Sequence, residues 1–214
     1  MKLLLAGAAA AALLLTGAQA SAATIVVTSA TLDSFSVQVA VPGHGNEFAS
    51  FININNGQFG VFCDDLFHSF SPGAQNPPII YKTGLVTTDS NGNLLTMSQS
   101  NRMGQLAEKG RFIHLTEFGQ DRFDDEAAIQ GAIWAIEYGI NVTSSDPTIQ
   151  AEITQFLTVA DNGKGFAQGL ISQDRHQSFV IGGVPEPTTW AMMILGLGAV
   201  GVAMRNRRKL ALAA

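Results

Sequence analysis

The sequence predicts an α+β fold: a β-rich domain with a helical insertion of about three helices, flanked by an N-terminal signal helix and a C-terminal transmembrane helix. Three observations support this prediction. Residues 35–41 alternate apolar and polar side chains, which is the period of a half-buried strand. Asn55-Asn56-Gly57 is a hairpin turn signal between two apolar runs. From Ser98 onwards, apolar residues recur at helical spacing.

Strands are expected at both ends of the domain, joined by turns rich in glycine, proline and asparagine. Five stretches have the composition of strands: 35–41, 48–54, 59–63, 79–88 and 177–182. The cluster at 42–46 contains proline and two glycines, so it predicts a turn. Residues 71–78 contain three prolines and a glycine, and they are expected to form a loop.

Three helices are expected in the middle of the domain, over residues 98–109, from about 124 to Gly139, and from Pro147 to about Val159. Gly110 is expected to stop the first helix. The acidic residues 124–126 suit the N-terminus of the second, and Gly139 suits its end. Asp146-Pro147 provides a cap and a proline near the first helical position of the third.

The N-terminus predicts a Sec-type signal peptide over residues 1–23, which implies handling by the Sec machinery. Lys2 precedes an apolar run over 3–15, and small residues at A-x-A spacing follow. The run is short for a membrane span. Cleavage after Ala20, Ala22 or Ala23 fits the pattern, with Ala23 preferred. The alternative is a buried N-terminal helix.

The C-terminal residues 184–214 predict a membrane anchor. The 17 residues 188–204 carry no charge, which is near the lower limit for spanning a bilayer. Four basic residues follow and are expected to act as a membrane stop on the cytoplasmic side: Arg205, Arg207, Arg208 and Lys209. The domain would then lie outside the inner membrane.

The order of motifs in this tail resembles the PEP-CTERM sorting signal. Pro185-Glu186-Pro187 precedes the apolar segment, and an Arg-rich end follows. The resemblance covers roughly the last thirty residues. It implies an exosortase that cleaves near the Pro-Glu-Pro motif, and a Gram-negative bacterium that makes extracellular polysaccharide. The alternative is an ordinary single-pass anchor that is never cleaved.

The domain between the two ends, residues 24–183, is acidic and contains the only cysteine. It has 7 basic and 16 acidic residues, which gives a formal net charge of about −9. This charge makes nucleic acid an improbable partner. A single cysteine excludes an internal disulfide and a multi-cysteine metal site. No metal or other cofactor is expected. The acidic runs at 64–65 and 124–126 lack the spaced ligands of an EF-hand loop.

Two stretches of the domain carry potential chemistry. Phe62-Cys63 ends an expected strand, and Gln130-Gly131-Ala132-Ile133-Trp134 lies on an expected helix. Together they resemble the Cys–Gln thioester domains of bacterial surface proteins, over roughly residues 50–160. One departure is that Asp64, not tryptophan, follows the cysteine.

The resemblance implies an internal thioester in which the Cys63 thiolate attacks the Gln130 amide and ammonia leaves. Thiolate formation, rigid placement and exclusion of water are the requirements of that step. Phe62 and Trp134 would surround the bond. The product is a protected electrophile that a lysine amine or a sugar hydroxyl can open. Without the paired motifs, Cys63 would be a buried core residue and Gln130 would cap a backbone group.

The sequence therefore predicts an exported, surface-sorted structural or adhesive protein of the extracellular polysaccharide matrix, such as that of a biofilm. It is not expected to be an enzyme. Its localisation would be the inner membrane during sorting, then the cell surface or matrix. One alternative is a non-covalent module that binds polysaccharide or a surface protein. Another is a cysteine hydrolase with His68 or His114 as the base.

Overall fold

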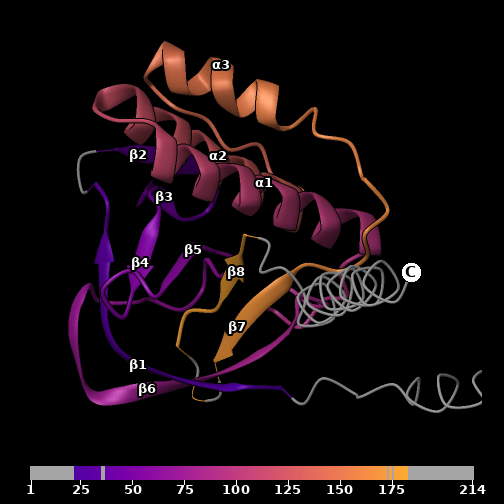
Figure 1. Ribbon diagram of the computed structural model, residues 1–214. Helices are drawn as coiled ribbons and strands as arrows, with labels where there is room; N and C mark the ends of the chain where they lie inside the picture. The colour runs from indigo at the N-terminus through magenta and orange to yellow at the C-terminus, as the bar shows by residue number, and fades with distance from the viewer. Residues whose placement is uncertain (1–21, 35–36, 173, 175, 183–214) are drawn as a thin grey trace, which may run out of the picture.

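A six-stranded barrel with helices packed along one side forms the domain (Figure 1). The computed structural model describes residues 22–182 except 35, 36, 173 and 175. Nearly all of the expected signal peptide, the Pro-Glu-Pro motif, the apolar segment 188–204 and the basic stop lie outside this range. Among the helices that are described, none combines the length and hydropathy that a bilayer crossing requires.

The barrel closes through antiparallel pairs in the order β1-β4-β5-β8-β7-β6. Its strands are β1 (Thr24–Leu32), β4 (Ile52–Ile54), β5 (Phe59–Cys63), β6 (Gly73–Leu85), β7 (Gln168–Ser172) and β8 (Phe179–Ile181). β2 (Gln38–Val41) and β3 (Gly45–Phe48) form a separate two-stranded sheet. The hairpin expected between β4 and β5 is confirmed, because Asn55, Asn56 and Gly57 all have positive φ.

Three expectations about the strands were wrong. Residues 48–54 do not form one strand, because β3 ends at Phe48 in the small sheet and β4 begins at Ile52 in the barrel. β1 and β7 were not among the expected strands. Residues 71–78 are not all loop, because β6 starts at Gly73. The pairing of β6 with β1 shifts register between Ala74 and Ile79. Pro77 and Pro78 fall in this irregular stretch, where the lack of an N–H is tolerated.

The three expected helices are present as α1 (Met97–Thr116), α2 (Gln120–Tyr138) and α3 (Pro147–Phe156). Gly139 ends α2 with φ of 64°, and the Asp146 side chain caps α3 as expected. The expectation that Gly110 ends α1 was wrong. A Cβ on Gly110 would lie 2.4 Å from the Phe62 ring, so this glycine lets α1 pack closely on the barrel.

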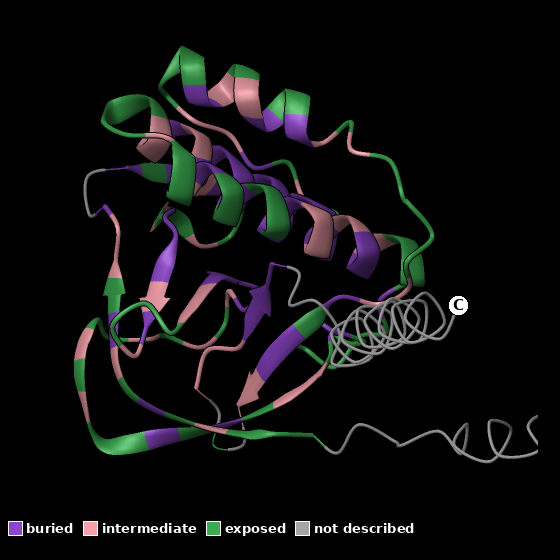
Figure 2. Ribbon diagram, viewed as in Figure 1, coloured by how far each residue is buried: buried purple, intermediate pink, exposed green. Residues whose placement is uncertain are grey.

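The second helix, α2, is buried along most of its length (Figure 2). It contacts α1, α3 and the small sheet, and its Gln130 reaches β5. Every residue from Glu126 to Glu137 is buried. Because most of the circumference of this stretch is covered, its polar side chains also lie inside the protein.

Candidate functional site

Cys63 and Gln130, which are 67 residues apart in sequence, meet between β5 and α2. The Cys63 backbone N–H donates to Gln130 Oε1 at 2.9 Å, and Gln130 Nε2 donates to the Cys63 carbonyl at 2.7 Å. Gln130 is fully buried, and Cys63 is 7% exposed. The structure therefore brings the two motifs together, with the Gln130 amide paired to the cysteine backbone.

The Gln130 amide forms the hydrogen bonds that a further β4 residue would form beside Cys63 of β5. β4 begins at Ile52, opposite Val61, so no β4 residue pairs with Cys63. Gln130 supplies the missing acceptor and donor instead. A buried backbone group without a partner costs about 1–3 kcal/mol, which gives this glutamine a structural role whether or not it reacts.

Phe62 and Trp134, the two residues expected around a thioester, lie in different surroundings. Phe62 is fully buried under α1, where its ring meets Gly110 and stacks edge-on against Phe51 with centroids 5.4 Å apart. Trp134 is one turn beyond Gln130 on α2 and lines a cavity beside Cys63. Its indole nitrogen is buried and has no hydrogen-bond partner among the described residues.

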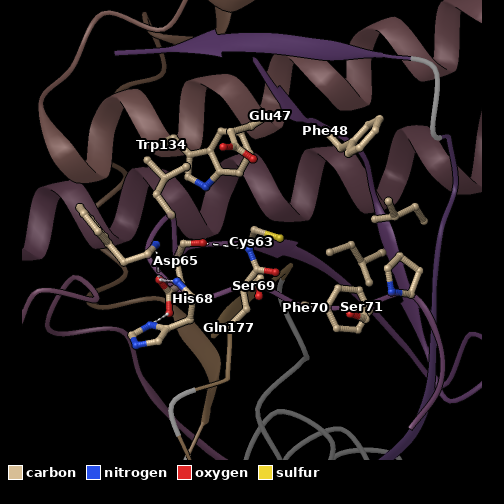
Figure 3. Close-up of a pocket in the computed structure, with 15 residues that line it drawn as sticks. Glu47, Phe48, Cys63, Asp65, His68, Ser69, Phe70, Ser71, Trp134 and Gln177 are labelled. Atoms are coloured by element: carbon tan, nitrogen blue, oxygen red, sulfur yellow. Dashed lines mark hydrogen bonds and ion pairs between the residues drawn. The ribbon is translucent and has the colours of Figure 1, made fainter. Parts of the chain in front are cut away.

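This cavity has a volume of about 450 Å³ and opens beside the cysteine (Figure 3). Its walls combine aromatic rings with carboxylate, amide and hydroxyl groups. Its lining includes Glu47, Cys63, Asp65, Phe67, His68, Phe70, Trp134 and Gln177. No lysine or arginine lines it in the described part of the chain. Figure 3 shows the indole nitrogen of Trp134 on the edge of the ring that faces Cys63 and Asp65.

Buried acids surround the cysteine, and we call Cys63, Asp64, Gln130 and Glu137 the thiol cluster. Burial raises the pKa of the Cys63 thiol, and the acids beside it raise it further. Burial also raises the pKa of Asp64 to about 8 and that of Glu137 well above its ordinary value. Asp64 Oδ1 and both Glu137 oxygens are buried without a partner in the described structure. Burial without a basic partner therefore favours the protonated form of both carboxyl groups.

Of the two histidines considered as bases, His68 lines the cavity beside Cys63 but is paired with Asp65, and His114 is paired with Glu126. His68 Nδ1 contacts Asp65 Oδ2 at 2.7 Å, and Figure 3 shows its ring directed away from Cys63. The Asp65 carboxylate also accepts hydrogen bonds from the backbone of Phe67 and His68, so it holds the loop after β5. His114 belongs to a second cluster.

That second group, Asp33, His114, Arg122 and Glu126, we call the ion-pair cluster. Arg122 Nη2 lies 2.6 Å from Asp33 Oδ2, and His114 Nδ1 lies 2.9 Å from Glu126 Oε1. Asp33, His114 and Glu126 are close enough to hold a metal ion. Arg122 already supplies a positive charge to both carboxylates, because its Nε is 3.7 Å from Glu126. A structural ion pair accounts for this arrangement.

Sequence reasoning did not find Glu47, Glu137 or Gln177 as neighbours of the cysteine. Glu137 follows Gln130 by seven residues, so helical periodicity places both on one face of α2, and this spacing was a usable signal. Glu47 is on β3, and Gln177 lies just before β8. No local pattern links these two residues to Cys63.

Comparison with known proteins identifies one segment. Residues 183–209 match the PEP-CTERM protein-sorting motif, which implies export, processing by exosortase, and membrane-associated sorting that delivers the chain to the surface. No curated protein and no solved structure matches the chain. The sorting motif expected from the sequence is thus confirmed, whereas these comparisons do not support the thioester resemblance.

Proposed function

We propose that this exported protein is a structural or adhesive component of the extracellular polysaccharide matrix, attached through a Cys63–Gln130 thioester. The observation that carries the proposal is the direct pairing of the Gln130 amide with Cys63. In the proposed step, Cys63 Sγ bonds to Gln130 Cδ and the Cδ–Nε2 bond breaks. The thiol proton leaves with the nitrogen as ammonia.

Two features of the site support this chemistry. The Cys63 N–H donates to Gln130 Oε1 at 2.9 Å, so it polarises the carbonyl and stabilises the negative charge that develops on that oxygen during attack. Burial of both residues restricts competing hydrolysis. The raised pKa of the thiol acts in the opposite direction, because it keeps the thiolate scarce. We therefore expect bond formation to be slow and to accelerate as pH rises.

The test is the intact mass of the exported chain before and after treatment with methylamine. A thioester lowers the mass by one ammonia, and methylamine then adds at Gln130 and frees one thiol. Cys63→Ala and Gln130→Ala are expected to retain the full mass. Gln99→Ala, a glutamine in the α1 cap, is the matched control and should still react. A wild-type chain of full mass with a titratable Cys63 at pH 8 contradicts the proposal.

A non-covalent binding module is the second candidate, and one observation favours it. Both polar groups of the Gln130 amide are already satisfied by the Cys63 backbone, which is what a purely structural cap requires. In that case the cavity beside Cys63 would bind its ligand reversibly. The ligand would be a polysaccharide or a surface protein, and Cys63→Ala would leave binding intact.

We do not favour a cysteine hydrolase, and we propose that the protein is not an enzyme. A catalytic cysteine needs a lowered thiol pKa and an adjacent base. Here the pKa of Cys63 is raised, His68 is directed away from the thiol, and His114 is bonded to Glu126. Hydrolysis of thioester substrates that Cys63→Ala abolishes would contradict this view.

Processing of the tail is a separate expectation. If exosortase cleaves near Pro185-Glu186-Pro187, the surface form lacks the apolar segment 188–204 and the basic stop. Mass measurement of the surface fraction checks this. Retention of residues 188–209 in cells that contain exosortase would favour an ordinary anchor.

A further inference from the structure

The cavity beside Cys63 determines which nucleophile can reach the proposed thioester, so the following inference rests on that proposed function. A lysine amine and a sugar hydroxyl both open thioesters. We propose that the acceptor of the Gln130 acyl group is a hydroxyl of a neutral carbohydrate. Three properties of the cavity wall lead to this choice.

The first property is the unpartnered donor of Trp134. The side chain is 2% exposed, and its Nε1–H is buried without an acceptor in the described structure, although it lines the cavity. A buried donor that faces a cavity favours a ligand with an acceptor atom. A hydroxyl oxygen accepts and donates, whereas an ammonium group only donates. The indole N–H therefore favours a hydroxyl over a protonated amine.

The second property is the acidity of the wall. Glu47 and Asp65 line the cavity, and no lysine or arginine does so within the described residues. His68 also lines it and is bonded to Asp65, so Glu47 is the carboxylate of the wall without a basic partner in the described structure. Nearby carboxylates favour the charged form of an incoming amine. An ammonium group has no lone pair with which to attack the acyl carbon. A hydroxyl keeps its lone pairs at neutral pH and donates a hydrogen bond to a carboxylate.

The third property is the combination of aromatic rings with polar groups. Phe67, Phe70 and Trp134 contribute apolar surface, and Gln177 and the carboxylates contribute hydrogen-bonding groups. A sugar ring presents apolar C–H faces and hydroxyl edges, so it matches both kinds of wall. The negative charge of the wall, and of the domain as a whole, disfavours an acidic sugar.

The reaction is balanced without another reagent. The hydroxyl oxygen bonds to Gln130 Cδ, the Cδ–Sγ bond breaks, and the hydroxyl proton passes to Cys63 Sγ. The products are an ester on residue 130 and a free thiol. Trp134 Nε1–H orients the attacking oxygen, so Trp134 is a positioning residue in this step.

The test is a competition between methyl glucoside and methylamine for the exported full chain. Ester and amide adducts on residue 130 are counted by mass spectrometry, and a small-molecule thioester in the same mixture gives the intrinsic ester-to-amide ratio. We expect the protein to exceed that ratio at least about tenfold, the factor expected from one well-placed hydrogen bond. Trp134→Phe, which keeps an aromatic ring but removes the N–H, is expected to return the ratio toward the intrinsic value.

A second variant guards against misfolding of Trp134→Phe. Glu47→Gln removes a carboxylate from the partly exposed strand β3 and is expected to lower the ratio, while Glu108→Gln on the exposed face of α1 should not change it. An ester-to-amide ratio of the protein at or below the intrinsic ratio would overturn this inference alone. A chain that reacts with neither probe and keeps its full mass would overturn the proposed function, and this inference with it.

Discussion

The thiol cluster and the ion-pair cluster both place buried polar groups on α2, yet their charges are balanced differently. In the ion-pair cluster, Arg122 and His114 face Asp33 and Glu126, so each acid has a basic partner. In the thiol cluster, Asp64 and Glu137 face no basic residue that the structure describes, and burial raises the pKa of both, which favours their protonated forms.

The comparison shows two ways to keep acids inside a protein. Paired charges stabilise one geometry, and removal of one partner leaves the other uncompensated. Protonated acids have no such partner, so they respond to pH. The ion-pair cluster therefore has the features of a structural site. The thiol cluster lies beside an open cavity, and it has the features of a site whose protonation changes with pH.

The largest expected effect is on the ion-pair cluster. Arg122→Ala leaves Asp33 and Glu126 without the guanidinium, and we expect the free energy of unfolding to fall by about 3 kcal/mol. Urea denaturation measures this. Arg111→Ala, an exposed arginine on α1, is the control and should change stability by less than about 0.5 kcal/mol. Equal effects of the two variants would remove the distinction between the clusters.

Loss of the Gln130 side chain should lower the free energy of unfolding by less than Arg122→Ala does. Gln130→Ala removes both hydrogen bonds to the Cys63 backbone, and we expect a destabilisation of about 2 kcal/mol in the reduced, unlinked chain. Urea denaturation of a Cys63→Ala background isolates this term from any thioester. If Gln130→Ala were neutral there, the amide would have no structural role.

The pH dependence tests the protonated acids directly. The pKa of Asp64 is about 8 in the folded protein against an ordinary value near 3.8, so the folded state holds a proton that the unfolded state releases. Stability is then fully present below about pH 4 and is lost as pH rises through about 8. We expect the melting temperature to fall by about 5 °C or more between pH 5 and pH 8.

Asp64→Asn keeps the size of the side chain without the titration. It should flatten the pH profile, whereas Glu152→Gln, at a more exposed acid with a raised pKa of about 7, should change it less. A melting temperature that rises from pH 5 to pH 8 in the wild type would show that these acids are ionised in the folded protein.

The smallest expected effect concerns the position at which the signal peptide is cleaved. Ala23 pairs with Thr83 of β6, because its N–H donates to Thr83 Oγ1 and its carbonyl accepts from Thr83 N, both at 2.8 Å. Cleavage after Ala23, which the sequence favoured, would remove these bonds from the folded domain. The contacts favour cleavage after Ala20 or Ala22, and we expect a mature N-terminus at Ser21 or Ala23. Intact mass distinguishes this from a chain that begins at Thr24.

Local residues predicted the elements whose causes are local. Asn55-Asn56-Gly57 adopts positive φ with little strain and so forms the hairpin, and Asp146-Pro147 begins α3 because a cap and a fixed φ act within one turn. Gly110 misled for the same reason. A glycine often ends a helix, but here Gly110 lies within α1 because the Phe62 ring, 48 residues earlier in the chain, leaves no room for a Cβ.

A family resemblance implied the pairing of a cysteine motif with a glutamine motif. The sequence alone determined the sorting motif, three helices and one hairpin. These features depend on composition and on neighbours within a few residues. Only the tertiary structure decided that β4 begins at Ile52, opposite Val61, so that Gln130 and not a β4 residue pairs with Cys63. It also decided that Glu47, Trp134 and Gln177 share one cavity. Barrel closure brings these distant segments together, and no local pattern records that proximity.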